Sequence, residues 1–171
     1  MSANITFVDE NDKVIGAGTI KEARQKGIIH RVSRIFLFNS KGELLIQKRA
    51  ARLTTSPGKW DQSAAGHVDE EEDYATAAKR ELAEELGVEN VALKEYGKSY
   101  SDETDDTDTV KKRFSMLYTG NYDGEVKPNA HEVSEVRWIN PDELDTWMNE
   151  RPTEFVASFI KNFRHLRNVK D

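Results

Sequence analysis

The sequence predicts a single α/β domain, and three observations support this fold class. The chain has 171 residues, which fits one domain that is long enough to bury a hydrophobic core. Short β-prone runs recur along it, and the strongest, residues 31–38, is mostly apolar, as is typical of a strand at the centre of a sheet. Two amphipathic helices are predicted over residues 73–86 and 153–166. We therefore expect one domain over residues 1–171.

The remaining elements follow from turn residues that separate the apolar runs. An N-terminal hairpin is predicted over residues 5–20, with turn chemistry at its middle. Later strands are expected at 43–49, 91–100, 110–119 and 131–140, and a short helix is expected from Pro141. The acidic stretch 101–109 is predicted to be an exposed hairpin tip, since it lacks the central glycine and terminal glutamate of a calcium-binding loop.

Composition excludes several classes of function. The net charge of −6 argues against binding a nucleic-acid polymer, which requires a basic face. The absence of cysteine excludes a disulfide framework, a thiolate zinc site and a cysteine nucleophile. No apolar run reaches the length of a membrane span, and the N-terminus lacks the basic and apolar regions of a secretory signal. A cytoplasmic protein without a membrane partner is the expectation.

The helix predicted over residues 73–86 has an apolar stripe. Asp69 or Asp73 is placed to cap its first turn, and Gly87 is placed to end it. Small and aliphatic side chains recur at steps of three and four residues, at Ala75, Ala78, Leu82 and Leu86. This spacing predicts that one side of the helix packs against the core.

The same helix has a stripe of carboxylates. Glu81, Glu84 and Glu85 are spaced so that they share one helical face, where they repel each other. The spacing alone leaves two interpretations open: a solvated acidic surface, or a site for a hard divalent cation such as Mg²⁺ or Mn²⁺. Arg80, beside the cluster, can pair with Glu72 and hold the preceding loop against the helix.

Residues 66–88 read GHVDEEEDYATAAKRELAEELGV. Their spacing matches the Nudix box, G-x5-E-x7-R-E-U-x-E-E-x-G-U, in which U is a bulky aliphatic residue, so the chain resembles the Nudix hydrolase superfamily. The matching positions are Gly66, Glu72, Arg80, Glu81, Leu82, Glu84, Glu85, Gly87 and Val88. The resemblance implies an α/β/α sandwich with a curved mixed β-sheet and a loop-helix-loop metal motif. It also implies hydrolysis, dependent on Mg²⁺ or Mn²⁺, of a nucleoside diphosphate linked to another moiety.

The resemblance also implies roles for residues of the box. In the family, the positions matching Glu81, Glu84 and Glu85 bind the metal, often with the carbonyl that matches Gly66. The position matching Arg80 orients a glutamate. Glu72 and Gly87 complete the structural motif.

The general base is placed variably in the family, either on a box glutamate or on an acid of a later loop. Glu84 and Glu85 are the candidates within the box. Glu132 resembles the later glutamate that approaches the metal site in many members, and the alternative for it is an exposed acid at the start of a strand.

A basic cluster lies around the end of the strand at 43–49. Arg49, Arg52 and Lys59 are candidates for binding substrate phosphates, and the alternative is an ordinary solvated strand end. The expected partner is a small-molecule diphosphate. Homodimers are frequent in the family, so a homodimer is a further expectation.

A second resemblance is to the isopentenyl-diphosphate isomerase branch of the superfamily, and it raises an alternative function. It covers residues 5–145 and rests on His30-Arg31, residues 44–49, residues 57–60 and Ala65-Gly66-His67. The isomerase needs a cysteine where this chain has Ala65, and only His30 and His67 match its metal histidines, so we expect both to be structural. A third class, a Nudix module that binds a nucleotide diphosphate without cleaving it, also stays open.

Overall fold

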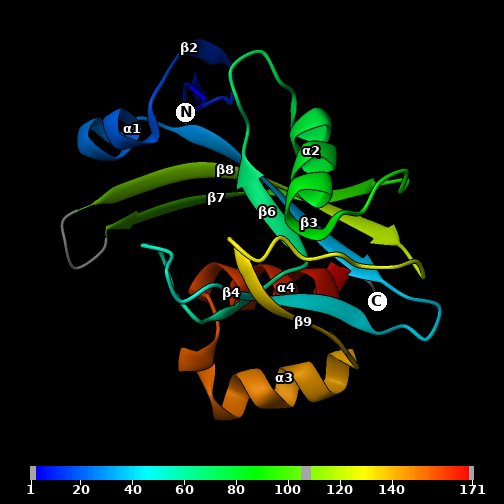
Figure 1. Cartoon of the computed structure of the whole chain (residues 1–171). Helices are drawn as coiled ribbons and strands as arrows, with labels where there is room; N and C mark the ends of the chain where they lie inside the picture. The colour runs from blue at the N-terminus through cyan, green and yellow to red at the C-terminus, as the bar shows by residue number, and fades with distance from the viewer. Residues whose placement is uncertain (1–2, 105–108, 170–171) are drawn as a thin grey trace.

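The structure is a computed structural model that describes residues 3–104 and 109–169. Within this part, nine strands form one mixed sheet that is flanked by α-helices (Figure 1). None of the helices described is both long and apolar enough to cross a membrane. The elements are β1 (Ile5–Val8), β2 (Val14–Gly18), α1 (Ile20–Lys26), β3 (His30–Phe38), β4 (Leu44–Arg49), β5 (Trp60–Asp61), β6 (Ala64–His67), α2 (Tyr74–Leu86), β7 (Lys94–Thr104), β8 (Val110–Asn121), β9 (Val133–Ile139), α3 (Pro141–Glu150), the 3₁₀ turn η1 (Pro152–Glu154) and α4 (Ala157–Val169).

The sheet is organised around β3. This strand pairs in parallel with β8 over its whole length, from His30 opposite Arg113 to Phe38 opposite Asn121. It pairs antiparallel with β1, β4 and β6, while β2 extends the sheet beyond β1 and β7 extends it beyond β8. Strand β4 carries β5 and β9. The α/β fold predicted from the sequence and the mixed sheet implied by the Nudix resemblance are confirmed.

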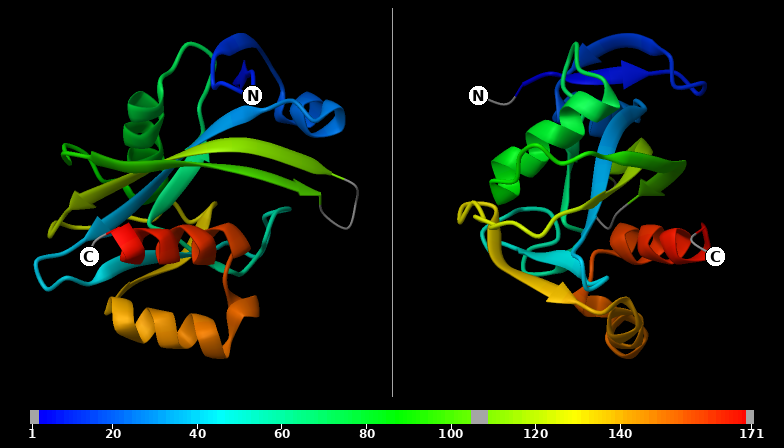
Figure 2. Two further views of the ribbon diagram at one scale, coloured as in Figure 1. Left: turned by 180° about the vertical axis from the view of Figure 1, so that it is seen from behind. Right: turned by 90° about the vertical axis from the view of Figure 1, so that its right-hand side faces the viewer.

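Side chains of β3 point alternately into two hydrophobic cores. Ile35 and Leu37 lie in the core under α2, whereas Phe36 and Phe38 lie in the core under α3 and α4. All four are buried, as expected for a strand covered on both faces. The right-hand view of Figure 2 shows the sheet between α2 on one side and α4 on the other. The predicted α/β/α sandwich is therefore confirmed.

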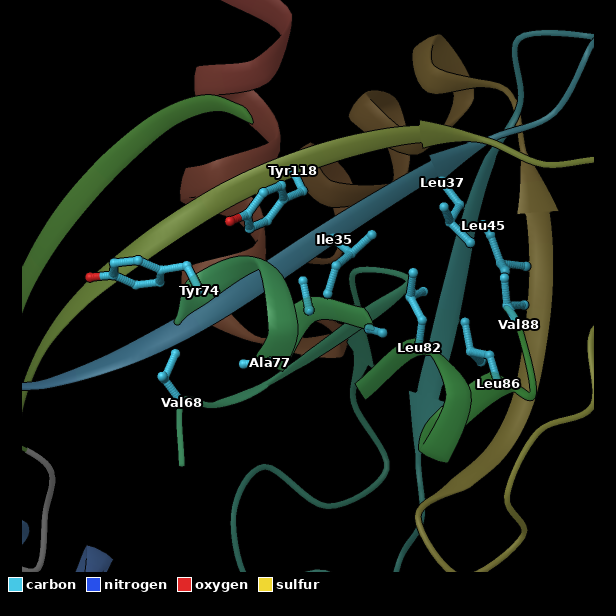
Figure 3. Close-up of a cluster of buried hydrophobic side chains, with 12 residues drawn as sticks. Ile35, Leu37, Leu45, Val68, Tyr74, Ala77, Leu82, Leu86, Val88 and Tyr118 are labelled. Carbon is cyan, nitrogen blue, oxygen red and sulfur yellow. The ribbon is translucent and has the colours of Figure 1, made fainter. Parts of the chain in front are cut away.

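Helix α2 packs on the first of these cores (Figure 3). Its buried apolar residues are Tyr74, Ala77, Ala78, Leu82 and Leu86. The predicted stripe is wrong at one position, because Ala75 is exposed. The first turn of the helix presents the ring of Tyr74 to the core instead, so the packing face begins one residue earlier.

The C-terminal helix predicted over 153–166 begins later than expected, at Ala157. Pro152–Glu154 form a 3₁₀ turn, and Phe155 adopts an extended conformation that bridges to Trp60. Because Phe155 is held extended by this long-range bridge, the helix does not start at residue 153. The expected aromatic stripe is nevertheless buried, at Phe155, Phe159 and Phe163.

The exposed tip predicted over residues 101–109 is shorter than expected. Residues 101–104 continue β7, because they pair with residues 110–113 of β8. The ladder places the acidic Asp102 opposite the basic Lys112, which favours pairing of this end of the hairpin. The rest of the predicted tip, residues 105–108, lies outside the described residues.

Candidate active site

The predicted ends of the box helix agree with those of α2. The carboxylate of Asp73 caps the helix by accepting a hydrogen bond from the backbone N–H of Thr76 at 2.7 Å. Gly87 ends it in the left-handed conformation, with a φ of 63°, and its N–H bonds back to the carbonyl of Ala83. These caps fix where the helix begins and ends, and the burial of its apolar face in the core determines which face is turned toward the sheet.

Arg80 connects the helix to the loop before it. Its Nε and Nη2 donate to the two carboxylate oxygens of Glu72 at 2.8 and 2.9 Å, and Nη2 also donates to the carbonyl of His67 at 2.9 Å. Its Nη1 donates to Glu81 at 2.7 Å and to Glu84 at 3.3 Å. The hydrogen bond to Glu72 is the main cause of the raised pKa of Arg80, and the same bond is the main cause of the lowered pKa of Glu72. Arg80 thereby holds one oxygen of Glu81 in a fixed position.

Glu85 is the buried acid of the site, with 7% of its surface exposed. Gln47 of β4 donates a hydrogen bond from Nε2 to its carboxyl group at 2.6 Å. Burial, followed by its hydrogen bond to Glu81, raises the pKa of Glu85 well above the ordinary value. Burial also raises the pKa of Glu81. Two negative carboxylates in contact repel each other. A shared proton or a bound cation would remove this repulsion.

Gly66 lies directly against this acid pair. A Cβ atom at position 66 would overlap the carboxyl group and Cγ of Glu81. Gly66 belongs to β6 and pairs with Ser33 of β3, so its backbone cannot move aside without breaking the sheet. Glycine is therefore required here for close approach rather than for an unusual backbone angle.

The donor set fits Mg²⁺ or Mn²⁺, although its side chains are not gathered around one point. Within residues 3–104 and 109–169, no three histidine or carboxylate side chains converge as a metal centre. The reason is that Arg80 holds Glu81 and Glu84. Glu84 has 53% of its side chain exposed and a long bond to Arg80, so rotation toward the acid pair costs little. The pKa values of Glu81 and Glu85 are raised, so a nearby positive charge would stabilise their ionised forms. Carboxylate oxygens are also the ligands that hard cations such as Mg²⁺ prefer.

The acids line a cavity of about 670 Å³. Glu132, just before β9, lies on its wall, and its charge contributes to the raised pKa of Glu85. Arg49 also lines this cavity. Arg52 and Lys59 do not line this cavity. They do not line a second, smaller cavity beside it either, and Arg52 donates to the backbone carbonyl of His131.

The rings of His30 and His67 lie together, with centroids 5.4 Å apart; His30 is fully buried, whereas His67 is half-buried and lines the cavity. Nδ1 of His30 donates to the carbonyl of Ile28 at 3.1 Å. Burial lowers the pKa of His30 to about 4 and that of His67 to about 3, so both rings are neutral near pH 7. Ala65, where the isomerase resemblance requires a cysteine, lines the same cavity as the acids.

Four polar side chains around the site were not among the predicted residues. They are Arg34, Gln47, Asp61 and Arg113. Two of them had a signal in the sequence: Arg34 interrupts the apolar run 31–38, and Gln47 follows the apolar centre of the strand at 43–49. A polar residue inside a buried strand needs a partner, which marks it for attention.

The structure combines a mixed open sheet between helix layers with a capped loop-helix-loop that presents acids to a cavity. This combination is that of a Nudix domain. Residues 29–159 match the family model described as the NUDIX domain. The chain therefore belongs to the Nudix hydrolase family.

Similar proteins include both hydrolases and isomerases of this family. The chain is 38% identical to an uncharacterized Nudix hydrolase of Pseudomonas aeruginosa, over 81% of this chain and 79% of that protein. It is 33% identical to isopentenyl-diphosphate Delta-isomerase 2 of Photorhabdus laumondii, over 94% of this chain and 90% of that protein. Among solved structures, DR0079 from Deinococcus radiodurans has a TM-score of 0.78 at 24% identity, covering 95% and 98% of the two chains, which supports the fold. The NUDIX domain of Shewanella oneidensis NrtR, complexed with ADP ribose, has a TM-score of 0.65 at 16% identity, covering 90% and 99% of the two chains.

Proposed function

We propose that the protein hydrolyses a diphosphate bond with the help of Mg²⁺ or Mn²⁺, acting on a nucleoside diphosphate linked to another moiety or on a related organic pyrophosphate. The observation that carries this proposal is the contact between Glu81 and Glu85, two acids with raised pKa values on the wall of a large cavity. Such a pair is costly for a structural surface, and a divalent cation offsets the cost.

Glu81, Glu84 and Glu85 would hold the cation, together with the carbonyl of Gly66. When bound, the cation supplies neutralisation of phosphate charge and lowers the pKa of a water molecule. Arg80 orients Glu81, and Gln47 orients Glu85 through the hydrogen bonds described above.

The other residues of the cavity have proposed roles toward substrate and water. Glu132, which lies on the cavity wall, is the proposed acceptor of the proton from the attacking water. Arg49 is the proposed phosphate contact, because it lines the cavity beside the acids. Contact of Arg52 and Lys59 with substrate stays a prediction.

Isomerisation of isopentenyl diphosphate is the alternative, and the 33% identity to an isomerase favours it. Ala65 disfavours it, since a methyl group cannot transfer the proton that a double-bond shift requires. Incubation with isopentenyl diphosphate in deuterated water distinguishes the two reactions. We expect no deuterium in the recovered substrate, and its incorporation would support the isomerase instead.

The hydrolase is tested by phosphate release from nucleoside di- and triphosphates, nucleotide sugars, dinucleoside polyphosphates and prenyl diphosphates with Mg²⁺ or Mn²⁺. Glu84→Gln and Glu85→Gln are expected to lose activity, while the control Glu89→Gln, on an exposed residue after the helix, keeps it. Unchanged activity of both box variants at saturating Mg²⁺ would refute the mechanism. Binding of Mg²⁺ without turnover of any compound would instead support a non-catalytic module.

Three further expectations stay predictions: a single domain over residues 1–171, a homodimer and a cytoplasmic location. Limited proteolysis tests the first, since one domain gives one protected core. Light scattering of the purified protein tests the second, and fractionation of cells tests the third.

A further inference from the structure

A second cavity, of about 200 Å³, adjoins the first. The two cavities have Arg49, Ala65, Gly66 and His67 in common, so they meet along β6. We call the smaller one the arginine cavity, because four arginines line it: Arg24, Arg34, Arg49 and Arg113. Its only lining carboxylate among the described residues is Asp61.

Arg34 is a buried cation without a carboxylate partner in the described chain. It points to the α4 side of β3 and has 4% of its surface exposed. Its Nε donates to the hydroxyl of Ser115 at 3.0 Å, and its Nη1 donates to the hydroxyl of Ser158 at 3.3 Å. Burial lowers its pKa to about 10. A guanidinium whose hydrogen bonds go to neutral hydroxyls in the interior is costly, because the nearby charge of Asp61 attracts it without bonding to it.

Arg113 of β8 adds a second cation with unused bonding capacity. Its Nε is buried and has no hydrogen-bond partner within the described residues. Its ion pair with Glu103 is long, at 3.5 Å, and burial lowers the pKa of Arg113. A buried donor that has no acceptor among the described residues is costly unless a water molecule or an anion meets it, so a bound anion would stabilise Arg113.

The remaining charges do not neutralise the cavity. Asp61 is buried, and burial raises its pKa despite the nearby guanidinium of Arg34. Its ion pair with Arg49 is 3.8 Å long. Among the lining residues other than Arg24, three arginines accompany one carboxylate, Asp61, whose charge is disfavoured by burial. Glu103, the partner of Arg113, does not line the cavity. The cavity is therefore built for an anion.

The size and donors of the arginine cavity select the kind of anion. At about 200 Å³ it is smaller than the roughly 300–1,000 Å³ of sites that enclose a whole small molecule. It therefore holds one group, while the rest of a ligand occupies the larger cavity. Guanidinium groups approach it from β3, β4 and β8. A phosphomonoester, with three terminal oxygens, can accept from three directions, whereas a carboxylate has two oxygens.

We propose that the arginine cavity binds a phosphomonoester at one end of the substrate, while the diphosphate of the same molecule lies against the acids of α2. The preferred substrates are thus organic diphosphates that carry an additional phosphate remote from the cleaved bond. This inference rests on the proposed hydrolase function, and it adds the substrate class.

Matched substrates test the proposal by kinetics. NADP⁺ and NAD⁺ differ by one phosphomonoester, as do coenzyme A and dephospho-coenzyme A, and all four contain a diphosphate. We expect kcat/KM to be at least roughly tenfold higher for the phosphorylated member of a hydrolysed pair. Arg113→Gln should bring the ratio near one, and Lys112→Gln, which removes the same charge from a neighbouring residue outside the cavity, should leave it unchanged. Equal kcat/KM values within each hydrolysed pair in the wild type would overturn the proposal.

A binding measurement keeps the test independent of catalysis. Thermal unfolding is followed with inorganic phosphate, against chloride at equal ionic strength, with EDTA present to remove divalent cations. Phosphate should raise the Tm of the wild type, Lys112→Gln and Glu84→Gln, but not that of Arg113→Gln. Arg34→Gln is a second variant with the same expectation, and Arg113→Gln still decides the result if Arg34→Gln does not fold.

The two measurements separate the inference from the proposed function. Absence of a phosphate effect in the wild type, or an equal effect in Arg113→Gln, would overturn the arginine cavity as an anion site even if diphosphates are hydrolysed. An effect that depends on Arg113, in a protein that hydrolyses no diphosphate, would leave the anion site standing and refute the hydrolase.

Discussion

Replacing Arg80 by lysine tests whether the guanidinium fork holds α2 against the loop before it. Lysine keeps the positive charge but has a single nitrogen, so it cannot bond both oxygens of Glu72 and also reach Glu81 and the carbonyl of His67. We expect at least two of these charge-assisted hydrogen bonds to be lost in Arg80→Lys.

The expected loss of stability follows from those contacts. A hydrogen bond to a charged group contributes about 1.5–3 kcal/mol. The side chain of Arg80 is 25% exposed, so solvent screening favours the lower end of that range. Two such bonds give a decrease of about 3 kcal/mol in the free energy of unfolding, or about 6–12 °C in Tm for a chain of this size.

Urea denaturation followed by circular dichroism measures the change, and Arg151→Lys is the matched control. Arg151 has one exposed ion pair, with Glu154 at 3.7 Å, so the same substitution there should cost less than about 0.5 kcal/mol. The reasoning would be wrong if Arg80→Lys lost no more stability than Arg151→Lys.

Three further predictions concern other parts of the chain. Gly66→Ala should lower kcat/KM by roughly 100-fold, because the new methyl group displaces the Glu81 carboxylate. Asp12→Asn should destabilise the protein by about 2 kcal/mol in thermal unfolding, because Asp12 accepts hydrogen bonds from Arg31, Tyr74 and Lys98. The pKa of His30 is lowered from 6.5 to about 4, so the unfolded chain binds more protons between these values, and stability in urea should fall by about 3 kcal/mol as the pH drops from 6.5 to 4.

Each of these predictions has a control. Gly16→Ala should keep full activity, since nothing lies within 4 Å of a Cβ built there, and equal loss in both glycine variants would contradict the argument. Glu10→Gln changes an exposed acid near Asp12 and should leave Tm unchanged. The pH dependence should be weaker in His30→Asn than in the wild type, and an identical slope would assign it to other groups.

The sequence predicted the central strand, the end of α2 at Gly87 and the grouping of its acids, because these depend on local periodicity and capping chemistry. It left the N-cap open between Asp69 and Asp73, and the structure shows Asp73. It did not predict where the last helix begins. That boundary depends on the bridge between Phe155 and Trp60, a contact between segments far apart in the chain. Hydrophobic periodicity is read within a short window of sequence, so it does not predict pairing between distant segments.

The candidate site was predicted unevenly for a similar reason. The box residues lie within one continuous stretch, so spacing placed them near each other. Arg34 and Arg113 come from strands far apart in sequence, and only the parallel pairing of β3 with β8 brings them to one cavity. The basic residues at the end of the strand over 43–49 identified Arg49, but not the arginines with which it forms the arginine cavity.

The alternation of side chains along β3 makes this strand sensitive to the number of its residues. Insertion of one codon before Ile35 would exchange the side chains assigned to the two cores, so that aliphatic groups would enter the space of aromatic ones and the reverse. Insertion of two codons would restore the alternation, although the pairing with β8 would shift. In a library of insertions selected for folded protein, single-codon insertions within residues 30–38 should therefore be rarer than those around Gly42. The chain reverses direction outside the sheet at Gly42, so an added residue there does not change the alternation.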